Sequence, residues 1–117
     1  MNRRRRSVLV AAPLGIAAAV LGSRRAEAAP PSKAQAAKAA FSATEADFRA
    51  GRATAEDVYL WSKRWLEAER TSNAAAAKDH LARMKALEAT VKANLQTGTS
   101  TKTDAFRCAY YVVEAAG

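Results

Sequence analysis

The sequence predicts an all-α protein whose antiparallel helical hairpins form a small three- or four-helix bundle behind an export signal. Three observations support this fold class. Alanine is the dominant residue and aromatic residues make up only 7% of the chain, which favours helix over sheet. Apolar residues recur at three- and four-residue steps, as on one face of a helix. A glycine-turn pattern also occurs twice, 47 residues apart.

The repeated pattern combines a helix end, a tight turn and a helix start. The glycine of each copy follows a helical run and suits the left-handed residue that ends a helix. A threonine follows three residues later, and an aspartate three residues after that, which is the Thr-x-x-Asp form of a capping box. The copies are Gly51, Thr54, Asp57 and Glu67, then Gly98, Thr101, Asp104 and Glu114. They predict two related helix–turn–helix units.

Residues 1–28 have the pattern of an export signal. Four arginines precede an apolar stretch at 7–22, and Ala26 and Ala28 fit the small-x-small cleavage rule. As a helix, that stretch would span about 24 Å, short of the roughly 30 Å hydrocarbon core of a membrane. We therefore expect cleavage after Ala28. Contact with a membrane is expected only if this segment stays uncleaved.

The export route rests on Arg5 and Arg6, which precede Ser7 and two apolar residues and resemble the twin-arginine pattern. Arg4 stands where that pattern usually has Ser or Thr, and a run of arginines also suits the general secretory route. Twin-arginine export is the preferred reading and the secretory route its alternative. By either route the mature protein is expected to be periplasmic or secreted.

The signal also accounts for much of the net charge of +8. It holds six basic residues and one acidic residue, whereas the remainder holds 13 basic and 10 acidic residues. Interspersed charges of both signs are typical of a solvated surface rather than a phosphate-binding one. We therefore expect no nucleic acid among the partners.

The mature chain is expected to begin with a short extended leader at 29–32, because each of its prolines biases the preceding residue away from helix. A single helical-hairpin domain then fills 33–117. Residues 33–50 form its first helix, which Ser32 can cap. The apolar stripe of this helix consists of Ala37, Ala40, Phe41, Thr44, Ala46 and Phe48.

The second helix begins after Thr54 and has the strongest apolar face. Its stripe consists of Val58, Trp61, Trp65 and Ala68, flanked by Ser62 and Leu66. We expect both tryptophans in the core, with each indole N–H near its edge. A ligand platform is the alternative interpretation.

Three consecutive capping-type residues at 71–73 are expected to break the chain into four helices rather than three. The third helix should bury Ala77, Leu81, Met84, Leu87 or Glu88, Val91 and Leu95. Gly98 ends it. The fourth should bury Ala105, Cys108, Ala109, Val112 and Val113.

Reactive residues are few. His80 and Cys108 are the only histidine and cysteine, so a His/Cys metal site within one chain is excluded. No glycine-rich phosphate loop or serine elbow occurs, and we expect no enzyme activity, cofactor or metal. His80 is expected to be packed or solvent-facing, and Cys108 to be a small buried residue. An intermolecular disulfide through Cys108 is the alternative outside the cytoplasm.

Phe48 to Gly51, Asp57-Val58 and Glu67-Ala68-Glu69 resemble the coiled-coil hairpins of TolC-type outer-membrane factors. The shared pattern is a helix end, a glycine turn, a capped helix starting Asp-Val and an alanine-rich face. The chain also resembles small exported helical modules with WS-x-R-x-L-x-AE and H-x-x-RM segments. It is far too short for an efflux duct, so the resemblance implies only a docking hairpin with 51–57 as its partner-facing tip.

These observations predict a non-catalytic exported protein, either an interaction or a structural module of the cell envelope. Its expected partner is an envelope protein or another copy of itself. The alternative is a periplasmic small-ligand or metal-binding helical bundle, which would need convergent polar groups in its core.

Overall fold

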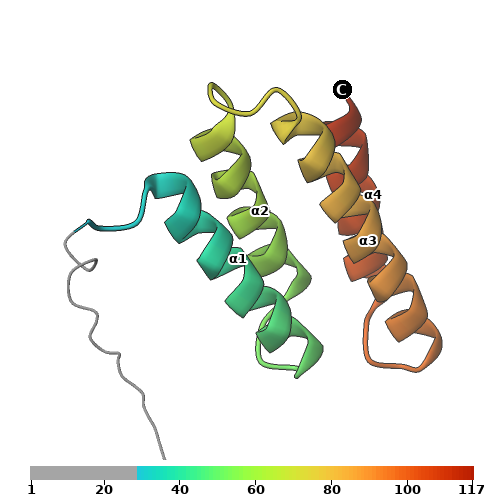
Figure 1. Cartoon of the computed structure of the whole chain (residues 1–117). Helices are drawn as coiled ribbons and strands as arrows, with labels where there is room; N and C mark the ends of the chain where they lie inside the picture. Colours follow the sequence, from blue (N-terminus) through green and yellow to red (C-terminus); the bar gives the residue numbers. More distant parts are fainter. Residues whose placement is uncertain (1–28) are drawn as a thin grey trace, which may run out of the picture. The chain divides into compact units, whose positions relative to one another are not determined.

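The computed structural model describes residues 29–117, and the expected export signal lies outside them. The described chain forms four helices and contains no strand. They are α1 (Lys33–Arg49), α2 (Ala55–Glu69), α3 (Ala76–Gln96) and α4 (Lys102–Ala116) (Figure 1). The all-α prediction is confirmed, and the chain does leave helical structure between α2 and α3, so the bundle has four helices.

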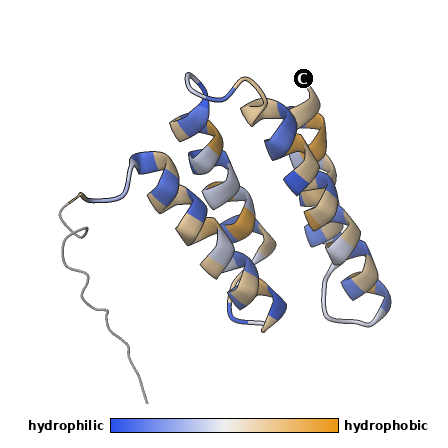
Figure 2. Ribbon diagram, in the orientation of Figure 1, coloured by the Kyte–Doolittle hydropathy of each residue, from blue (hydrophilic) through white to orange (hydrophobic). Residues whose placement is uncertain are grey.

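The helices pack as two hairpins. The first hairpin consists of α1 on α2 and the second of α3 on α4, and α2 joins them by contacting both α3 and α4. The turns at 50–54 and 97–101 lie at the same end, and the α2–α3 connection lies at the other (Figure 1). We call the end with the two turns the tip end. Figure 2 shows hydrophilic and hydrophobic positions alternating along each helix, as expected for helices with one buried face.

Both turns have the same backbone geometry. Gly51 has a φ of 80° and Gly98 a φ of 83°. The residue after each glycine donates its N–H to a carbonyl five residues earlier, at 2.7 Å in the first turn and 2.8 Å in the second. Each glycine donates to the carbonyl three residues before it. These paired bonds form a Schellman motif, in which a left-handed glycine ends the helix.

The helix after each turn starts with a complete capping box. The Thr54 hydroxyl accepts from the Asp57 N–H at 3.1 Å, and the Asp57 carboxylate accepts from the Thr54 N–H at 3.0 Å. Thr101 and Asp104 make the same two bonds, both at 3.1 Å. Ser32 and Gln35 form a third box at the start of α1. The two units therefore have the same turn geometry, and α2 and α4 have the same length of 15 residues.

The Gly51→Ala variant should lose about 1 kcal/mol or more of unfolding free energy, because an L side chain is penalised at positive φ. A Cβ built at Gly51 meets nothing within 4 Å, so the cost arises from the backbone alone. Chemical denaturation measures it. Gly51→Asn is the control and should cost less, because asparagine tolerates the left-handed region. Equal stability of Gly51→Ala and wild type would contradict the turn assignment.

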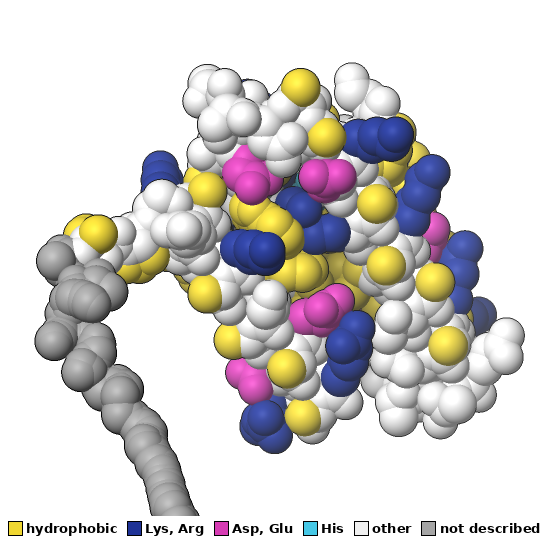
Figure 3. Space-filling model, viewed as in Figure 1, with side chains coloured by type: hydrophobic (Ala, Val, Ile, Leu, Met, Phe, Trp, Pro, Cys, Tyr) yellow, Lys and Arg dark blue, Asp and Glu magenta, His cyan; other side chains and the backbone are white. Residues whose placement is uncertain are grey.

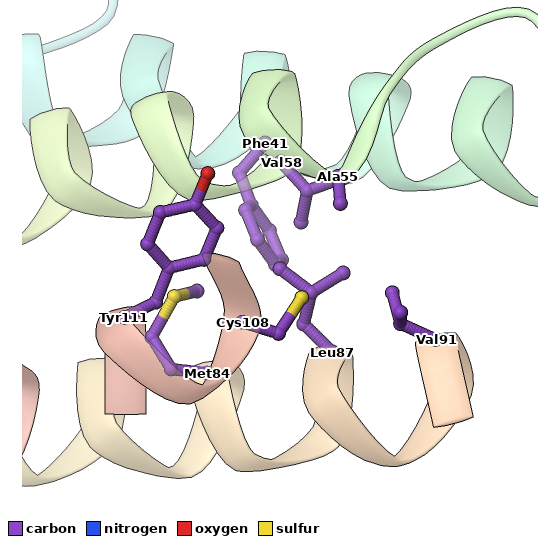
Figure 4. Packing of buried hydrophobic residues seen from close by; sticks show 8 residues of the cluster. All are labelled: Phe41, Ala55, Val58, Met84, Leu87, Val91, Cys108 and Tyr111. Carbon is purple, nitrogen blue, oxygen red and sulfur yellow. The ribbon is translucent and has the colours of Figure 1, made fainter. Parts of the chain in front are cut away.

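The core lies between α2 and the second hairpin. Figure 4 shows its residues converging from all four helices. They are Phe41, Ala55, Val58, Met84, Leu87, Val91, Cys108 and Tyr111. Cys108 is buried, as expected, with 0% of its surface exposed, and His80 is packed rather than solvent-facing, with 1% exposed.

Several predicted core positions are wrong by one step around a helix. In α2 the fully buried residues are Ala55, Val58, Ser62 and Leu66, and the two tryptophans are only half-buried. In α3 the chain buries Ala76 and His80 in place of Ala77 and Leu81. In α4 it buries Tyr111 and exposes 70% of Val113; in α1 it exposes Ala46. The reason is that α2 packs against three helices. The neighbouring helices therefore determine which part of the wide apolar surface of each helix is buried.

Candidate functional site

The two turns line one cleft at the tip end. Its volume is about 480 Å³. Gly51 and Thr54 line it from the first hairpin, and Thr99, Ser100 and Asp104 line it from the second. The sequence predicts the two tips as separate elements, and the structure places them side by side as one continuous surface.

Several charged groups of the tip end already have partners. The carboxylates of Asp57 and Asp104 accept capping hydrogen bonds. The Arg52 guanidinium pairs with Asp47 at 3.1 Å, and Arg49 pairs with Glu45 at 3.4 Å. The cleft therefore offers hydroxyl and backbone groups within a charged rim. Such a lining suits contact with a polar protein segment better than acid–base chemistry.

A second polar cluster links α2 to α3. The Ser62 hydroxyl lies 2.8 Å from Nδ1 of His80 and accepts from Nε of Arg83 at 2.6 Å. Arg83 also donates from Nη2 to the Ser62 carbonyl at 3.1 Å. Because a guanidinium only donates, Ser62 is the acceptor of the Arg83 bond. The tautomer of His80 decides whether the Ser62 hydroxyl donates to Nδ1 or accepts from it.

The pKa of His80 is lowered to about 4, first by burial and then by the charges of Arg83 and Lys63, while Glu114 opposes them. The ring is therefore uncharged at neutral pH. A serine hydroxyl beside an imidazole resembles a nucleophile–base pair. Here, however, Ser62 is fully buried and its oxygen receives a hydrogen bond from a cation. This arrangement makes the pair a structural link between the hairpins.

A third polar cluster links α2 to α4. The Tyr59 hydroxyl donates to the Glu114 carboxylate at 2.7 Å, and Lys63 Nζ lies 3.3 Å from the same oxygen. The hydrogen bond from Tyr59 lowers the pKa of Glu114, and burial raises the pKa of Tyr59. The rings of Tyr59 and Tyr111 stack with centroids 4.0 Å apart. A hollow of about 270 Å³ beside this cluster is lined by Lys63, His80 and Glu114, among others.

The tryptophans differ in their surroundings. Trp65 packs between the Arg83 guanidinium, 4.0 Å from its ring centroid, and Phe41, whose centroid lies 5.5 Å away. Its indole N–H is buried and has no hydrogen-bond partner within residues 29–117, so the expected position near the core edge is wrong for this residue. Trp61 instead lies under Arg64, at 4.6 Å. Figure 3 shows basic and acidic side chains over the hydrophobic strip between the hairpins.

Cys108 is buried where the second hairpin packs against α2. Burial raises the pKa of its thiol to about 11. The thiol is therefore protonated at neutral pH and has 0% of its surface exposed. An intermolecular disulfide would require the hairpins to separate, so the packed structure supports the role of a small core residue.

The described residues include neither a metal-site candidate nor a membrane-crossing candidate. No group of three or more His, Cys, Asp and Glu residues in 29–117 could hold a metal ion. No helix in that range is long and apolar enough to cross a membrane. The predicted signal residues Arg5, Arg6, Ala26 and Ala28 lie outside this range. Comparisons with protein-family models, curated proteins and solved structures found no match.

Proposed function

We propose that this chain is a non-catalytic protein-binding module of the cell envelope, exported through the signal at residues 1–28 and working in the periplasm or after secretion. The observation that carries the proposal is the pair of hairpin tips that line one cleft. A duplicated turn held by Schellman motifs and capping boxes is rigid, and rigid surfaces lose little entropy on binding. The twin-arginine-like pattern at Arg5 and Arg6 supports export of a folded bundle.

The tip end is tested with charge-matched variants. Ala53 lines the cleft from the first turn and Ser100 from the second, so a double change to arginine should block a docked partner. For envelope proteins that wild type captures reproducibly, we expect the captured amount to fall about tenfold or more. A loss of about 1.4 kcal/mol of binding free energy, through repulsion and steric overlap, is enough for this. Quantitative pull-down from the envelope fraction measures the loss.

Ala74→Arg with Ala75→Arg is the control for this test, because it adds the same two charges to exposed positions in the connection at the opposite end. Its capture should equal that of wild type. Equal capture by the double variant would contradict a tip-mediated contact, and the absence of any reproducible partner would count against the whole proposal.

The second candidate function, a small-ligand-binding bundle, is favoured by the hollow beside Lys63, His80 and Glu114. Nε2 of His80 is buried there without a hydrogen-bond partner in the described chain. A ligand bound in this hollow would raise the melting temperature of wild type and not of His80→Asn. Zinc and haem are the probes to use, and a shift with either would promote this function above the first.

A further inference from the structure

The two hairpins present equivalent faces in different environments. In α2, every residue of the face that packs on the second hairpin is buried or half-buried. It consists of Ala55, Val58, Tyr59, Ser62, Lys63 and Leu66. The residues 47 positions later in α4 are Lys102, Ala105, Phe106, Ala109, Tyr110 and Val113. Phe106, Tyr110 and Val113 are 74%, 60% and 70% exposed.

The apolar α4 face is unpartnered in the described chain because the hairpins do not meet through like surfaces. The first hairpin contributes the outer face of α2. The second contributes a groove between α3 and α4, formed by His80, Met84, Cys108 and Tyr111. When two repeats meet through unlike surfaces, one surface of each kind stays without a partner. Here these are the α4 face of the second hairpin and the α1–α2 groove of the first.

The leftover groove has room for a protruding face. A hollow of about 400 Å³ is lined by Lys33, Ala36, Ala37, Trp61 and Arg64. The equivalent residues of the second hairpin, 47 positions later, all belong to the groove that receives α2. They are His80, Arg83, Met84, Cys108 and Tyr111. Alanines replace two large α3 side chains, so the first hairpin is hollow where the second is filled. Conversely, α4 carries Phe and Tyr at the positions where α2 carries Tyr59 and Lys63.

We propose that the α4 face of one chain docks into the α1–α2 hollow of a second copy, repeating between chains the contact that joins the hairpins within one chain. In this contact Phe106 would take the position of Tyr59, and Arg64 of the second copy would take the position of Tyr111. Phe106 and Arg64 would then form a cation–π pair. Tyr110 would reach Glu67 of the second copy, which holds the position of Glu114. Val113 would fill the place of Leu66.

This contact is head-to-tail, so each chain still offers a free face and a free hollow after docking. Chains then add in series, as repeats do in a solenoid, until a ring closes or a filament grows. The inference rests on the proposed function in that it names a second copy as one of its protein partners. It uses a surface other than the tips.

The test uses two variants that each remove one half of the contact. Phe106→Glu with Tyr110→Glu removes the α4 face, and Ala36→Arg fills the hollow with the side chain that α3 carries at the matching position. All three positions are exposed, so circular dichroism should show wild-type helix content. Sedimentation velocity on the purified exported chain should show wild type growing beyond dimers with concentration. Each variant alone should be monomeric, with association weakened at least tenfold.

Mixing the two variants gives the decisive measurement. The first keeps an intact hollow and the second an intact α4 face, so the mixture should form heterodimers and nothing larger. Ala82→Arg, an exposed change on α3, should associate like wild type. A wild type that stays monomeric overturns the inference, as does association that Ala36→Arg leaves intact, which would mean contact between like α4 faces. Capture of envelope proteins by the tips is scored separately, so either proposal can fail alone.

Discussion

The Trp65→Ala variant is expected to lose about 3–4 kcal/mol of unfolding free energy. The indole packs between Phe41 of α1 and the Arg83 guanidinium of α3, so its removal leaves a cavity and withdraws a cation–π partner. It thereby weakens the contact of α1 with the rest of the bundle. A domain of this size has a total stability of roughly 5–10 kcal/mol, so the loss should be evident in a urea titration.

Trp61→Ala is the matched control, because the same side chain is half-buried one turn away. Trp61 also packs against the core, but its cation–π partner Arg64 lies on its own helix, so its removal should cost less, about 2 kcal/mol. Both variants are compared at a protein concentration low enough to keep the chain monomeric. Equal losses for the two would contradict the packing of Trp65 between α1 and α3.

Acidification from pH 6.5 to pH 4 is expected to remove up to about 3 kcal/mol of unfolding free energy through His80 alone. The folded state holds the pKa of His80 at about 4, below its ordinary value of 6.5. Between these values the unfolded chain binds a proton that the folded chain excludes. Stability therefore falls as the pH drops through this window, and the His80 contribution levels off below pH 4.

Burial sets the direction of this effect, and the charged groups that face His80 modify its size. Arg83 and Lys63 disfavour a second positive charge, and Glu114 partly offsets them. The pKa of Glu114 is lowered from its ordinary value of 4.5, so its own contribution to stability begins to fall only near the lower end of the His80 window. His80→Asn keeps an acceptor for the Ser62 hydroxyl but does not titrate. Its unfolding free energy, followed by urea titration at each pH, should lack this slope, and an unchanged slope would assign the acid sensitivity elsewhere.

The sequence predicts the helices and turns well because their signals are local. Gly51 and Gly98 need left-handed backbone, and Thr54 and Thr101 start helices by capping boxes whose partners lie three residues away. Such short-range bonds form in the same way wherever the helices later pack. The sequence therefore predicts the tip residues, but not the cleft that they line together.

The packing was harder to predict because several sides of each helix are apolar. Ser62 stands in the middle of the apolar face of α2, and that position is the signal that could have located the buried polar cluster. Its partners His80 and Arg83 are 18 and 21 residues away and belong to another helix. Tyr111 was missed for a similar reason, because its burial depends on stacking against Tyr59 of α2.

The most direct test of the account is the distance between the two tips. Nitroxide labels at Arg52 and Thr99, introduced as cysteines with Cys108→Ala as background, occupy exposed and equivalent positions in the two turns. Hairpins packed side by side predict strong dipolar broadening between the labels, because both turns border one cleft. If α2 and α3 instead continued into each other as one helix over 55–96, the tips would lie roughly 63 Å apart at 1.5 Å per residue. A spectrum without broadening would contradict the paired-hairpin structure.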